Sequence, residues 1–273
     1  EAYFQGKKHL FKGLAIEQLE QEWRVRPVLR LDLNTEKYDS IDSVDQKLDR
    51  EFKIWEELYG ADEAEVTLPM RFEGIIRRAY KKTGERVVIL IDEYDKPLLQ
   101  AISNKPLQNE YRATLKAVYG ALKSMDGCIK FALLTGVTKF GKVSVFSDLN
   151  HLRDISMLEQ YTEICGISEK ELHSYFRNEI TEMAELHQTS YDDMTDMLRQ
   201  NYDGYHFAPN TNGMYNPYSL LNVFADKKLG SYWFETGTPT YLVELLKSNE
   251  YKLDDVNGYI VGIEGLSGTD AAD

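Results

Sequence analysis

Cysteines and long apolar runs are scarce in this sequence. Its 273 residues include only Cys128 and Cys165, with neither a CxxC nor a His-flanked metal spacing. We therefore expect buried free thiols and a reducing compartment rather than a disulfide framework. The longest aliphatic run, residues 87–91, is far shorter than the roughly 20 residues that cross a bilayer. Because no positively charged leader precedes an apolar segment, we expect a cytoplasmic protein without a membrane partner.

Positive charge is also in short supply. Lysine and arginine number 32 against 45 aspartates and glutamates, for a net charge of −13 at pH 7. This balance argues against a surface that wraps nucleic acid through bulk attraction, although it leaves room for a local basic groove. The composition is otherwise that of an ordinary globular chain, long enough for one large or two modest cores.

Helix-like and strand-like patterns alternate in the first half of the chain. Apolar residues at helical spacing predict helices over residues 10–23, 48–58, 72–80 and 107–125. Residues 28–33 predict a strand, and residues 86–92, with a continuous apolar stretch, and residues 129–136 predict buried strands. Strands separated by helices favour a parallel sheet with right-handed crossovers. The predicted fold class is therefore α/β, with helices flanking the sheet.

The second half changes to a set of short helices. Four predicted helix starts have a capping side chain, supported by an acid three residues later or by a following proline: Ser168, Ser190, Asn216 and Thr238. We therefore place a domain boundary near Gly166. It separates a sheet domain over residues 1–166 from a mainly helical lid domain over residues 167–273.

The most informative motif ends the second predicted strand. The five apolar residues 87–91 run directly into Asp92 and Glu93. This is the Walker B pattern of P-loop ATPases, in which a buried strand delivers carboxylates to the sheet edge where ligands gather. Asp92 would hold the shell of Mg²⁺, which prefers hard oxygen ligands, and Glu93 would polarise the water that attacks the γ-phosphate of ATP. The structural alternative is a buried strand that ends in a solvated acidic turn.

A phosphate loop of the form G-x-x-x-x-G-K-[ST] should accompany these acids. The nearest match, residues 136–143, has Val143 where the magnesium-binding hydroxyl belongs, and it follows the acidic strand instead of preceding it. We therefore reject it and interpret Gly136 and Gly141 as turn residues. Lys139 and Lys142 are interpreted as surface lysines in preference to phosphate contacts.

Two more polar residues lie near the acidic motif in the predicted fold. Thr135 ends the strand that follows the Asp-Glu strand. AAA-type ATPases keep there a sensor that hydrogen-bonds the γ-phosphate or the attacking water, and a turn hydroxyl is the structural alternative. Asp95 could act as a supporting acid, but we prefer the N-cap of a turn before Pro97.

Several multi-residue blocks together resemble the AAA-ATPase-like family of bacterial proteins. They occur in the family's order at residues 90–97, 134–140, 202–207, 215–221 and 232–239. The resemblance covers nearly the whole chain and implies a P-loop NTPase-like sheet that binds ATP and Mg²⁺. It also implies Asp92 as the Mg²⁺ ligand, Glu93 as the water-activating acid and Thr135 as the sensor.

The resemblance further implies segments beyond this sequence. The family's phosphate loop, Arg-Phe-Gly-Lys-Ser, lies a short helix ahead of the residues that match residues 1–6, so we expect the first strand and the loop to be missing here. A PD-(D/E)XK nuclease-like domain usually follows the ATPase region. We expect a nucleic acid partner only through that absent domain, leave a homo-oligomer open, and expect this region alone to be inactive.

Other interpretations of these residues stay open. In a degenerate nucleotide-binding or scaffold module, the acids would be structural. A metal-dependent nuclease using Asp92, Glu93 and Asp95 is disfavoured, because three acids within four residues at a strand end cannot all face one metal ion. We interpret the aromatic residues near 202–236 as core and packing residues rather than base-stacking ones. The candidate arginine fingers are Arg112, Arg153 and Arg177.

Overall fold

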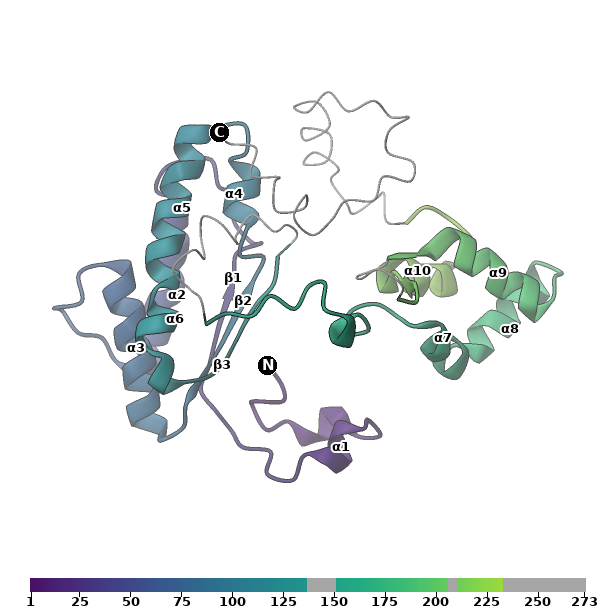
Figure 1. The fold of residues 1–273 in the computed structure, drawn as a ribbon, viewed down its shortest axis with the longest axis horizontal. Coiled ribbons are helices and arrows are strands. Elements are labelled where there is room, and N and C mark those ends of the chain that lie inside the picture. Colours follow the sequence, from purple (N-terminus) through teal and green to yellow (C-terminus); the bar gives the residue numbers. More distant parts are fainter. Residues whose placement is uncertain (137–150, 206–210, 233–273) are drawn as a thin grey trace. The chain divides into compact units, whose positions relative to one another are not determined.

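The computed structural model describes residues 1–136, 151–205 and 211–232, which Figure 1 draws as a coloured ribbon. The chain divides into two units, one of which contains Glu1–Leu152, while the other begins at Arg153. A parallel sheet forms the centre of the first unit, and the described part of the second is mainly helical.

The described sheet of the first unit has three parallel strands, in the order β1-β2-β3. They are β1 (Val28–Asp32), β2 (Val87–Asp92) and β3 (Ile129–Leu134). β2 pairs in parallel with both neighbours, so it is the middle strand of the described sheet. The prediction of an α/β chain with a parallel sheet is confirmed.

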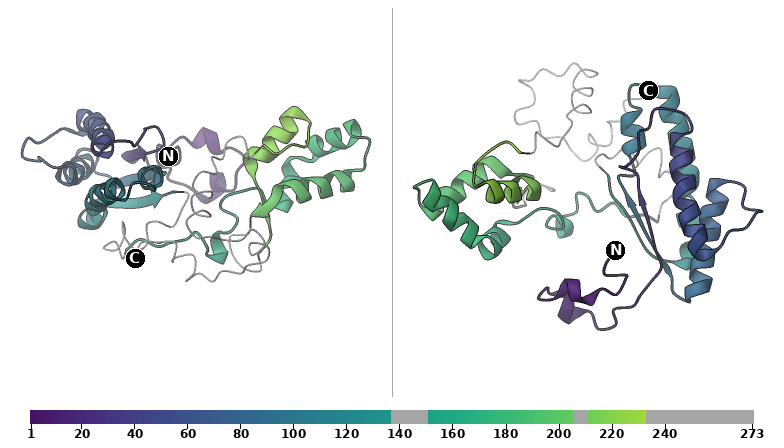
Figure 2. Two further views of the ribbon diagram at one scale, coloured as in Figure 1. Left: turned by 90° about the horizontal axis from the view of Figure 1, so that it is seen from above. Right: turned by 180° about the vertical axis from the view of Figure 1, so that it is seen from behind.

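Helices connect the strands. In chain order they are α2 (Ser43–Tyr59), α3 (Leu68–Thr83), α4 (Lys96–Gln100), α5 (Lys105–Tyr119) and α6 (Ala121–Ser124), followed by the 3-10 turn η2 (Asp126–Cys128). The ends of α3 match its sequence, because the Thr67 hydroxyl accepts the Met70 N–H and Gly84 ends the helix in the left-handed conformation. Figures 1 and 2 show α2, α3, α5 and α6 on the same side of the sheet.

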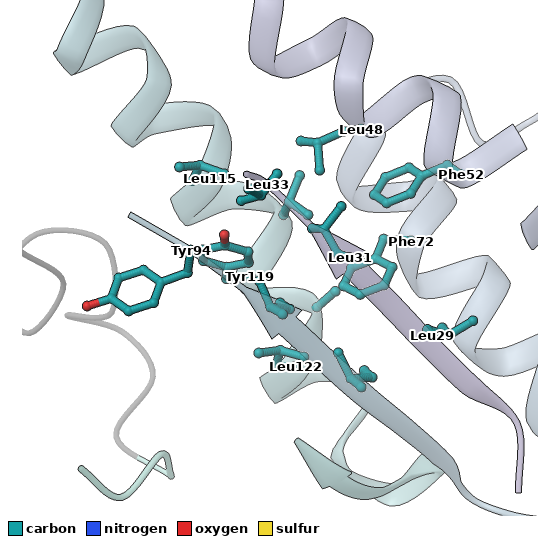
Figure 3. Packing of buried hydrophobic residues seen from close by; sticks show 14 of the residues in the cluster. Leu29, Leu31, Leu33, Leu48, Phe52, Phe72, Tyr94, Leu115, Tyr119 and Leu122 are labelled. Atoms are coloured by element: carbon teal, nitrogen blue, oxygen red, sulfur yellow. The ribbon is translucent and has the colours of Figure 1, made fainter. Parts of the chain in front are cut away.

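The helix-covered face of the sheet holds the main hydrophobic core. Leu29, Leu31 and Leu33 alternate along β1 and its continuation and are at most 2% exposed. They share one buried cluster with Phe52 of α2 and Phe72 of α3, whose rings stack with centroids 5.3 Å apart, as Figure 3 shows. Full burial of one such side chain stabilises the fold by about 1.5–3 kcal/mol. This face therefore fixes the strands against α2 and α3.

The opposite face of the sheet is more open at β3. Phe131 is 42% exposed and Leu133 is 39% exposed, so the prediction of a buried strand at residues 129–136 is wrong for these side chains. The register pairs Phe131 with Val88 and Leu133 with Leu90. Within the described residues, the helices that connect the strands cover the other face, which explains the difference. The ring of Phe4 lies 5.6 Å from that of Phe131.

The N-terminal segment is not the helix predicted over residues 10–23. It forms two short turns, η1 (Lys8–Phe11) and α1 (Ile16–Leu19). Gly13 lies between them with a φ of +82°, a value that an α-helix cannot contain. The leucines that suggested the helix are all more than half exposed, so their spacing did not produce a buried face.

The structure differs from prediction at a few other positions. Ile54 and Leu58 point outward from α2, with exposed fractions of 47% and 56%. The helix predicted over residues 107–125 breaks at Gly120 into α5 and α6. Both cysteines are free, as expected, but Cys165 is exposed and Cys128 is only half-buried.

The second unit packs short helices around a small antiparallel sheet. Its described elements are η3 (Glu159–Tyr161), α7 (Glu169–Tyr175), α8 (Arg177–Leu186), α9 (Tyr191–Tyr202), β4 (Asp203–Tyr205), β5 (Met214–Tyr215) and α10 (Pro217–Asp226). The capping box of Ser168 and Glu171 is present, and Ser190 and Asn216 cap α9 and α10. These three predicted helix starts are confirmed, while Thr238 lies outside the described residues.

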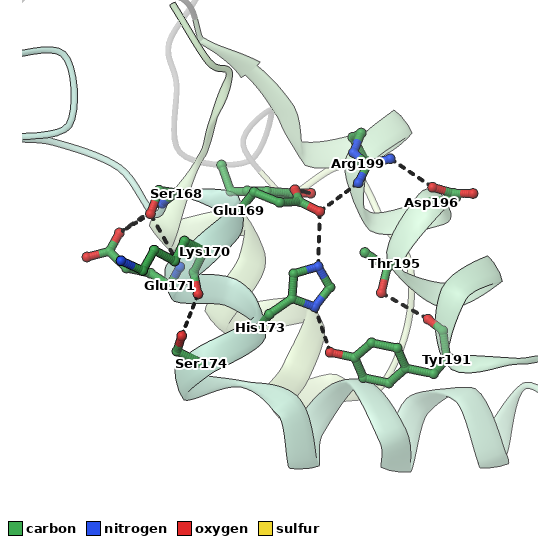
Figure 4. Close-up of polar contacts among 11 residues, drawn as sticks. Ser168, Glu169, Lys170, Glu171, His173, Ser174, Tyr191, Thr195, Asp196 and Arg199 are labelled. Atoms are coloured by element: carbon green, nitrogen blue, oxygen red, sulfur yellow. Dashed lines mark hydrogen bonds and ion pairs between the residues drawn. The ribbon is translucent and has the colours of Figure 1, made fainter.

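A polar network joins α7, α9 and β5 in this unit. The Glu169 carboxylate accepts hydrogen bonds from the Tyr215 hydroxyl and from Arg199, whose Nη2 lies 2.6 Å away. Nε2 of His173 lies 3.2 Å from the same carboxylate, and its Nδ1 lies 2.8 Å from the Tyr191 hydroxyl, as Figure 4 shows. Although burial alone would raise it, these hydrogen bonds lower the pKa of Glu169. The network therefore holds a charged carboxylate at the meeting point of three elements.

Buried aromatic residues complete the core of the second unit. Tyr202 and Tyr215 are 5% and 1% exposed, and the Tyr202 hydroxyl donates to the Gly230 carbonyl at 2.9 Å. The interpretation as core residues is confirmed for these two, whereas Tyr218 is 46% exposed. The remaining aromatic residues of the predicted blocks at 206–210 and beyond residue 232 lie outside the described residues.

Gly166 occupies a backbone position that another residue would strain. Its φ is +101°, and a Cβ there would lie 2.9 Å from the Cβ of Met214 and 3.3 Å from the Tyr215 carbonyl oxygen. We expect Gly166→Ala to lower the free energy of unfolding by about 1–3 kcal/mol, measured by urea unfolding followed by circular dichroism. The matched control is Gly127→Ala, where no atom lies within 4 Å of the added Cβ. Equal stability of the two variants would contradict the expectation.

Candidate functional site

The ends of the three parallel strands bring polar residues together. The register pairs Asp32, the last residue of β1, with Asp92, the last residue of β2. Thr135 directly follows β3, and its N–H donates to the Ile91 carbonyl at 2.9 Å. Parallel strands present their carboxyl ends at one edge of a sheet, which is where ligands bind in open α/β folds. The candidate site is defined as Asp32, Asp92, Glu93 and Thr135.

A hydrogen bond links two of the predicted site residues. The Thr135 hydroxyl donates to Oδ1 of Asp92 at a distance of 2.6 Å. The side chain of Asp92 is nevertheless 48% exposed, so its carboxylate remains accessible. Because Thr135 holds one oxygen, the carboxylate has a defined orientation at the strand end.

Sequence reasoning missed Asp32 and also Arg30, which lies beside the site. Nη2 of Arg30 lies 3.7 Å from Oδ2 of Asp32 and 3.7 Å from Oδ2 of Asp92. The signal was present in the alternation along β1, which places Arg30 and Asp32 on the sheet face opposite the buried leucines. The strand pairing that aligns Asp32 with Asp92, however, is a long-range property.

The backbone at Glu93 is strained. Its φ is +55°, in the left-handed region that costs a residue with a Cβ about 1–3 kcal/mol and often marks functional sites. Hydrogen bonds hold the chain on both sides of it. The Asp92 carbonyl accepts the Leu33 N–H at 3.1 Å, and the Tyr94 N–H donates to the Thr135 carbonyl at 2.9 Å.

The Glu93 side chain combines burial with an unused hydrogen-bonding atom. Among the described residues, its Oε2 is buried and has no hydrogen-bond partner, which is uncommon for a buried polar atom. Burial raises the pKa of Glu93, and the nearby charge of Asp95 raises it further. This carboxylate is therefore a stronger base than an exposed glutamate.

Asp95 lies two residues after Glu93 and is part of its charged surroundings. It stands at the N-cap position of α4, as predicted, but its side chain makes no capping hydrogen bond. It is instead fully buried, and its Oδ1 would lie only 2.6 Å from a Cβ at position 136. Gly136 is needed here for this close approach and not only for a turn. The other residues of the rejected loop, Lys139 and Lys142 included, lie outside the described residues.

The oxygen atoms at the strand ends suit a magnesium ion that arrives with a nucleotide. No group of three or more His, Cys, Asp or Glu is arranged for a metal ion within the described ranges. A nuclease site formed by Asp92, Glu93 and Asp95 on one ion therefore has no support there. The carboxylates of Asp32 and Asp92 are hard ligands, and Mg²⁺ is commonly held by one or two carboxylates together with phosphate and water oxygens. The residues present fit that arrangement.

The three candidate arginine fingers are described by their surroundings within their own units. Arg112 donates to Asn109 at 2.7 Å on α5, and the guanidinium of Arg177 lies over the Tyr191 ring at 5.5 Å. Arg153 is exposed in the second unit. These contacts assign no catalytic role to any of them.

Comparison with known proteins identifies the family. The model of a family described as predicted AAA-ATPases matches residues 1–146, which include every residue of the site. The chain belongs to the AAA-ATPase-like family. It is also 36% identical, over 243 residues, to an uncharacterised protein encoded in the 5′ region of vnfD in Azotobacter chroococcum mcd 1.

This AAA-ATPase-like chain covers only part of that relative. The match spans 89% of the chain but 45% of the Azotobacter protein. No solved structure matches the chain significantly. Among the described helices, none has the length and apolar character needed to span a membrane.

The raised pKa of Glu93 predicts a pH-dependent cost in stability. The folded chain binds the proton of this carboxyl more tightly than the unfolded chain does. Its contribution is therefore fully present below the ordinary glutamate pKa and is lost as the pH rises through the raised value. We expect Glu93→Gln, which is neutral at every pH, to be more stable than wild type near neutral pH, with a difference that shrinks on acidification.

Chemical unfolding of both proteins across about pH 4.5–8, without metal or nucleotide, measures this difference. The matched control is Glu57→Gln, which changes an exposed glutamate on α2. A stability difference for Glu93→Gln that is constant with pH would show that the surroundings do not raise the pKa of the Glu93 carboxyl group.

Proposed function

We propose that this AAA-ATPase-like chain is the ATP-binding and ATP-hydrolysing module of a larger bacterial protein, with ATP and Mg²⁺ as cofactors. The observation that carries the proposal is the arrangement at the end of β2. Asp92 is oriented by the Thr135 hydroxyl at 2.6 Å, and the adjacent Glu93 has a buried oxygen without a hydrogen-bond partner among the described residues.

Asp92 is assigned to the metal shell in this proposal. One of its oxygens is held by Thr135, and the carboxylate is half exposed at the sheet edge. It can therefore accept hydrogen bonds from metal-bound water or contact the ion directly. When bound, Mg²⁺ neutralises charge on the phosphate oxygens.

Glu93 is assigned as the residue that orients and polarises the attacking water. A general base is most effective when its pKa lies close to the working pH, and burial raises the pKa of Glu93 in that direction. Its unpaired Oε2 can accept a hydrogen bond from water.

Thr135 is assigned as the sensor. Its hydroxyl donates its one proton in the hydrogen bond to Asp92, while its oxygen can still accept a hydrogen bond. A change of partner from Asp92 to phosphate or water would report the state of the nucleotide. The neighbouring ends of β2 and β3 therefore link metal binding to sensing.

The wider assignment follows from the family. We propose an ATPase core over residues 1–166 and a lid over residues 167–273, in a cytoplasmic protein that couples ATP hydrolysis to a nuclease-like domain. Support for a longer functional protein comes from the Azotobacter relative, of which the chain covers 45%. A nucleic acid partner and a homo-oligomer belong to that whole protein.

The test compares wild-type full-length protein with two isosteric variants. We expect Glu93→Gln to bind Mg²⁺-ATP as tightly as wild type, within about twofold, and to hydrolyse it at least about 100-fold more slowly. Asp92→Asn should lose most of the Mg²⁺ dependence of ATP binding. Binding is measured with a fluorescent ATP analogue, and turnover by phosphate release.

Glu57→Gln serves as the control, because it removes an exposed carboxylate on α2 that is not part of the candidate site. Turnover by Glu93→Gln within threefold of wild type would contradict the role of Glu93. ATP binding without hydrolysis in the wild type would instead assign a degenerate nucleotide-binding module.

A further inference from the structure

Arg30 places a positive charge beside the two strand-end carboxylates. It lies on β1, two residues before Asp32 on the same face, and its register partner is Leu90. One guanidinium nitrogen, Nη2, lies 3.7 Å from Oδ2 of Asp32 and 3.7 Å from Oδ2 of Asp92. The other terminal nitrogen, Nη1, lies 3.6 Å from Oε2 of Glu1. A single cation therefore bridges the ends of β1 and β2.

The contacts of Arg30 with the carboxylates are electrostatic and loose. At 3.7 Å they are longer than the 2.7–3.2 Å of protein N–H···O hydrogen bonds. The Arg30 side chain is 49% exposed, and the Asp92 side chain is 48% exposed. Exposed ion pairs of this kind contribute little to the stability of a fold, so stability alone does not account for a guanidinium at this place.

Charge balance at the strand ends suggests another role. Asp32 and Asp92 are direct neighbours across the strand pair, and like charges in that arrangement repel each other. Arg30 offsets this repulsion. A divalent cation that reaches Asp92 would meet the guanidinium on the same Oδ2 oxygen, since Oδ1 is held by Thr135.

We propose that Arg30 is a positioning residue that acts as an internal counter-ion for Asp32 and Asp92 and is displaced by the incoming divalent cation. The proposal deepens the proposed function and rests on its assignment of Asp92 to the metal shell. The loose contacts allow displacement without the loss of a short hydrogen bond. Arg30 thereby weakens binding of a bare metal ion and favours an ion that arrives with the compensating charge of a nucleotide.

The test measures Mn²⁺ binding to the full-length protein without nucleotide, using the electron paramagnetic resonance signal of free Mn²⁺. We expect Arg30→Gln to bind Mn²⁺ roughly three- to tenfold more tightly than wild type, because it removes a positive charge beside the ligand. Arg30→Lys keeps the charge and should bind Mn²⁺ as wild type does, within about twofold.

Two further variants separate a local effect from a general change in charge. Arg86→Gln removes an exposed arginine that precedes β2, at the other end of the sheet, and should leave Mn²⁺ affinity unchanged. The double variant Arg30→Gln with Glu57→Gln has the net charge of wild type but keeps every carboxylate of the site, so it should bind Mn²⁺ as tightly as Arg30→Gln does.

The outcomes that overturn the proposal are distinct. Mn²⁺ binding by Arg30→Gln that is equal to or weaker than wild type would overturn it, as would undetectable binding by both proteins. Equal tightening in Arg86→Gln or Arg30→Lys would also overturn it, because neither a remote charge nor a retained charge should act in this way.

The proposed function is judged by a separate readout. If wild type and Glu93→Gln hydrolyse ATP equally slowly while Arg30→Gln still tightens Mn²⁺ binding, the ATPase assignment fails and the counter-ion role stands. If hydrolysis depends on Glu93 but Mn²⁺ affinity does not respond to Arg30, the reverse conclusion holds.

Discussion

The parallel pairing of β2 with strands on both sides is the constraint on which the candidate site depends. The register aligns Asp32 with Asp92 and places Thr135 next in line after the pair Ile91 and Leu134. A slip of one residue would turn every side chain of a strand to the other face. It would remove the leucines of β1 from the core and the acids from the edge together. The core that covers one face therefore also secures the geometry of the site.

The strain at Glu93 depends on the same sheet. The peptide groups before and after this residue are held by hydrogen bonds to Leu33 and to Thr135, on two different neighbouring segments. These bonds leave Glu93 to absorb the change of direction, with a φ of +55°. A cost of about 1–3 kcal/mol for such a conformation is small beside the burial of the many apolar side chains in the first core. The fold can thus sustain a poorly satisfied carboxylate at the point where the proposed chemistry needs one.

Electrostatics at the strand ends show how a strongly acidic chain can hold a closely spaced group of acids. Asp92 is balanced by a hydroxyl on one oxygen and by a guanidinium near the other. Glu93 has a buried oxygen without a hydrogen-bond partner among the described residues, and its pKa is raised by burial and by Asp95. Two adjacent carboxylates therefore differ in environment, which is the condition for giving them different roles. In the second unit, by contrast, hydrogen bonds lower the pKa of Glu169.

Local signals were sufficient for many elements of this chain. The apolar run before Asp92 predicted β2, the capping residues at positions 168, 190 and 216 predicted three helix starts, and Thr135 was expected beside the acidic strand. Each of these features is encoded within a few consecutive residues, by hydrophobicity or by a cap. The same local reasoning failed for residues 10–23, where Gly13 takes a positive φ, and for β3, where burial depends on what covers the strand.

The sequence by itself determined the α/β alternation, the acidic strand end and the family to which the chain belongs. Only the tertiary structure decided that Asp32 lies beside Asp92, that Arg30 bridges them and that Glu93 keeps an unpaired oxygen among the described residues. The physical reason is that the contacts of Asp32 and Arg30 with Asp92 join residues about 60 positions apart through strand register. The unpaired oxygen of Glu93, in turn, depends on burial. Neither quantity can be read from a local pattern, because both are set by the packing of the whole unit.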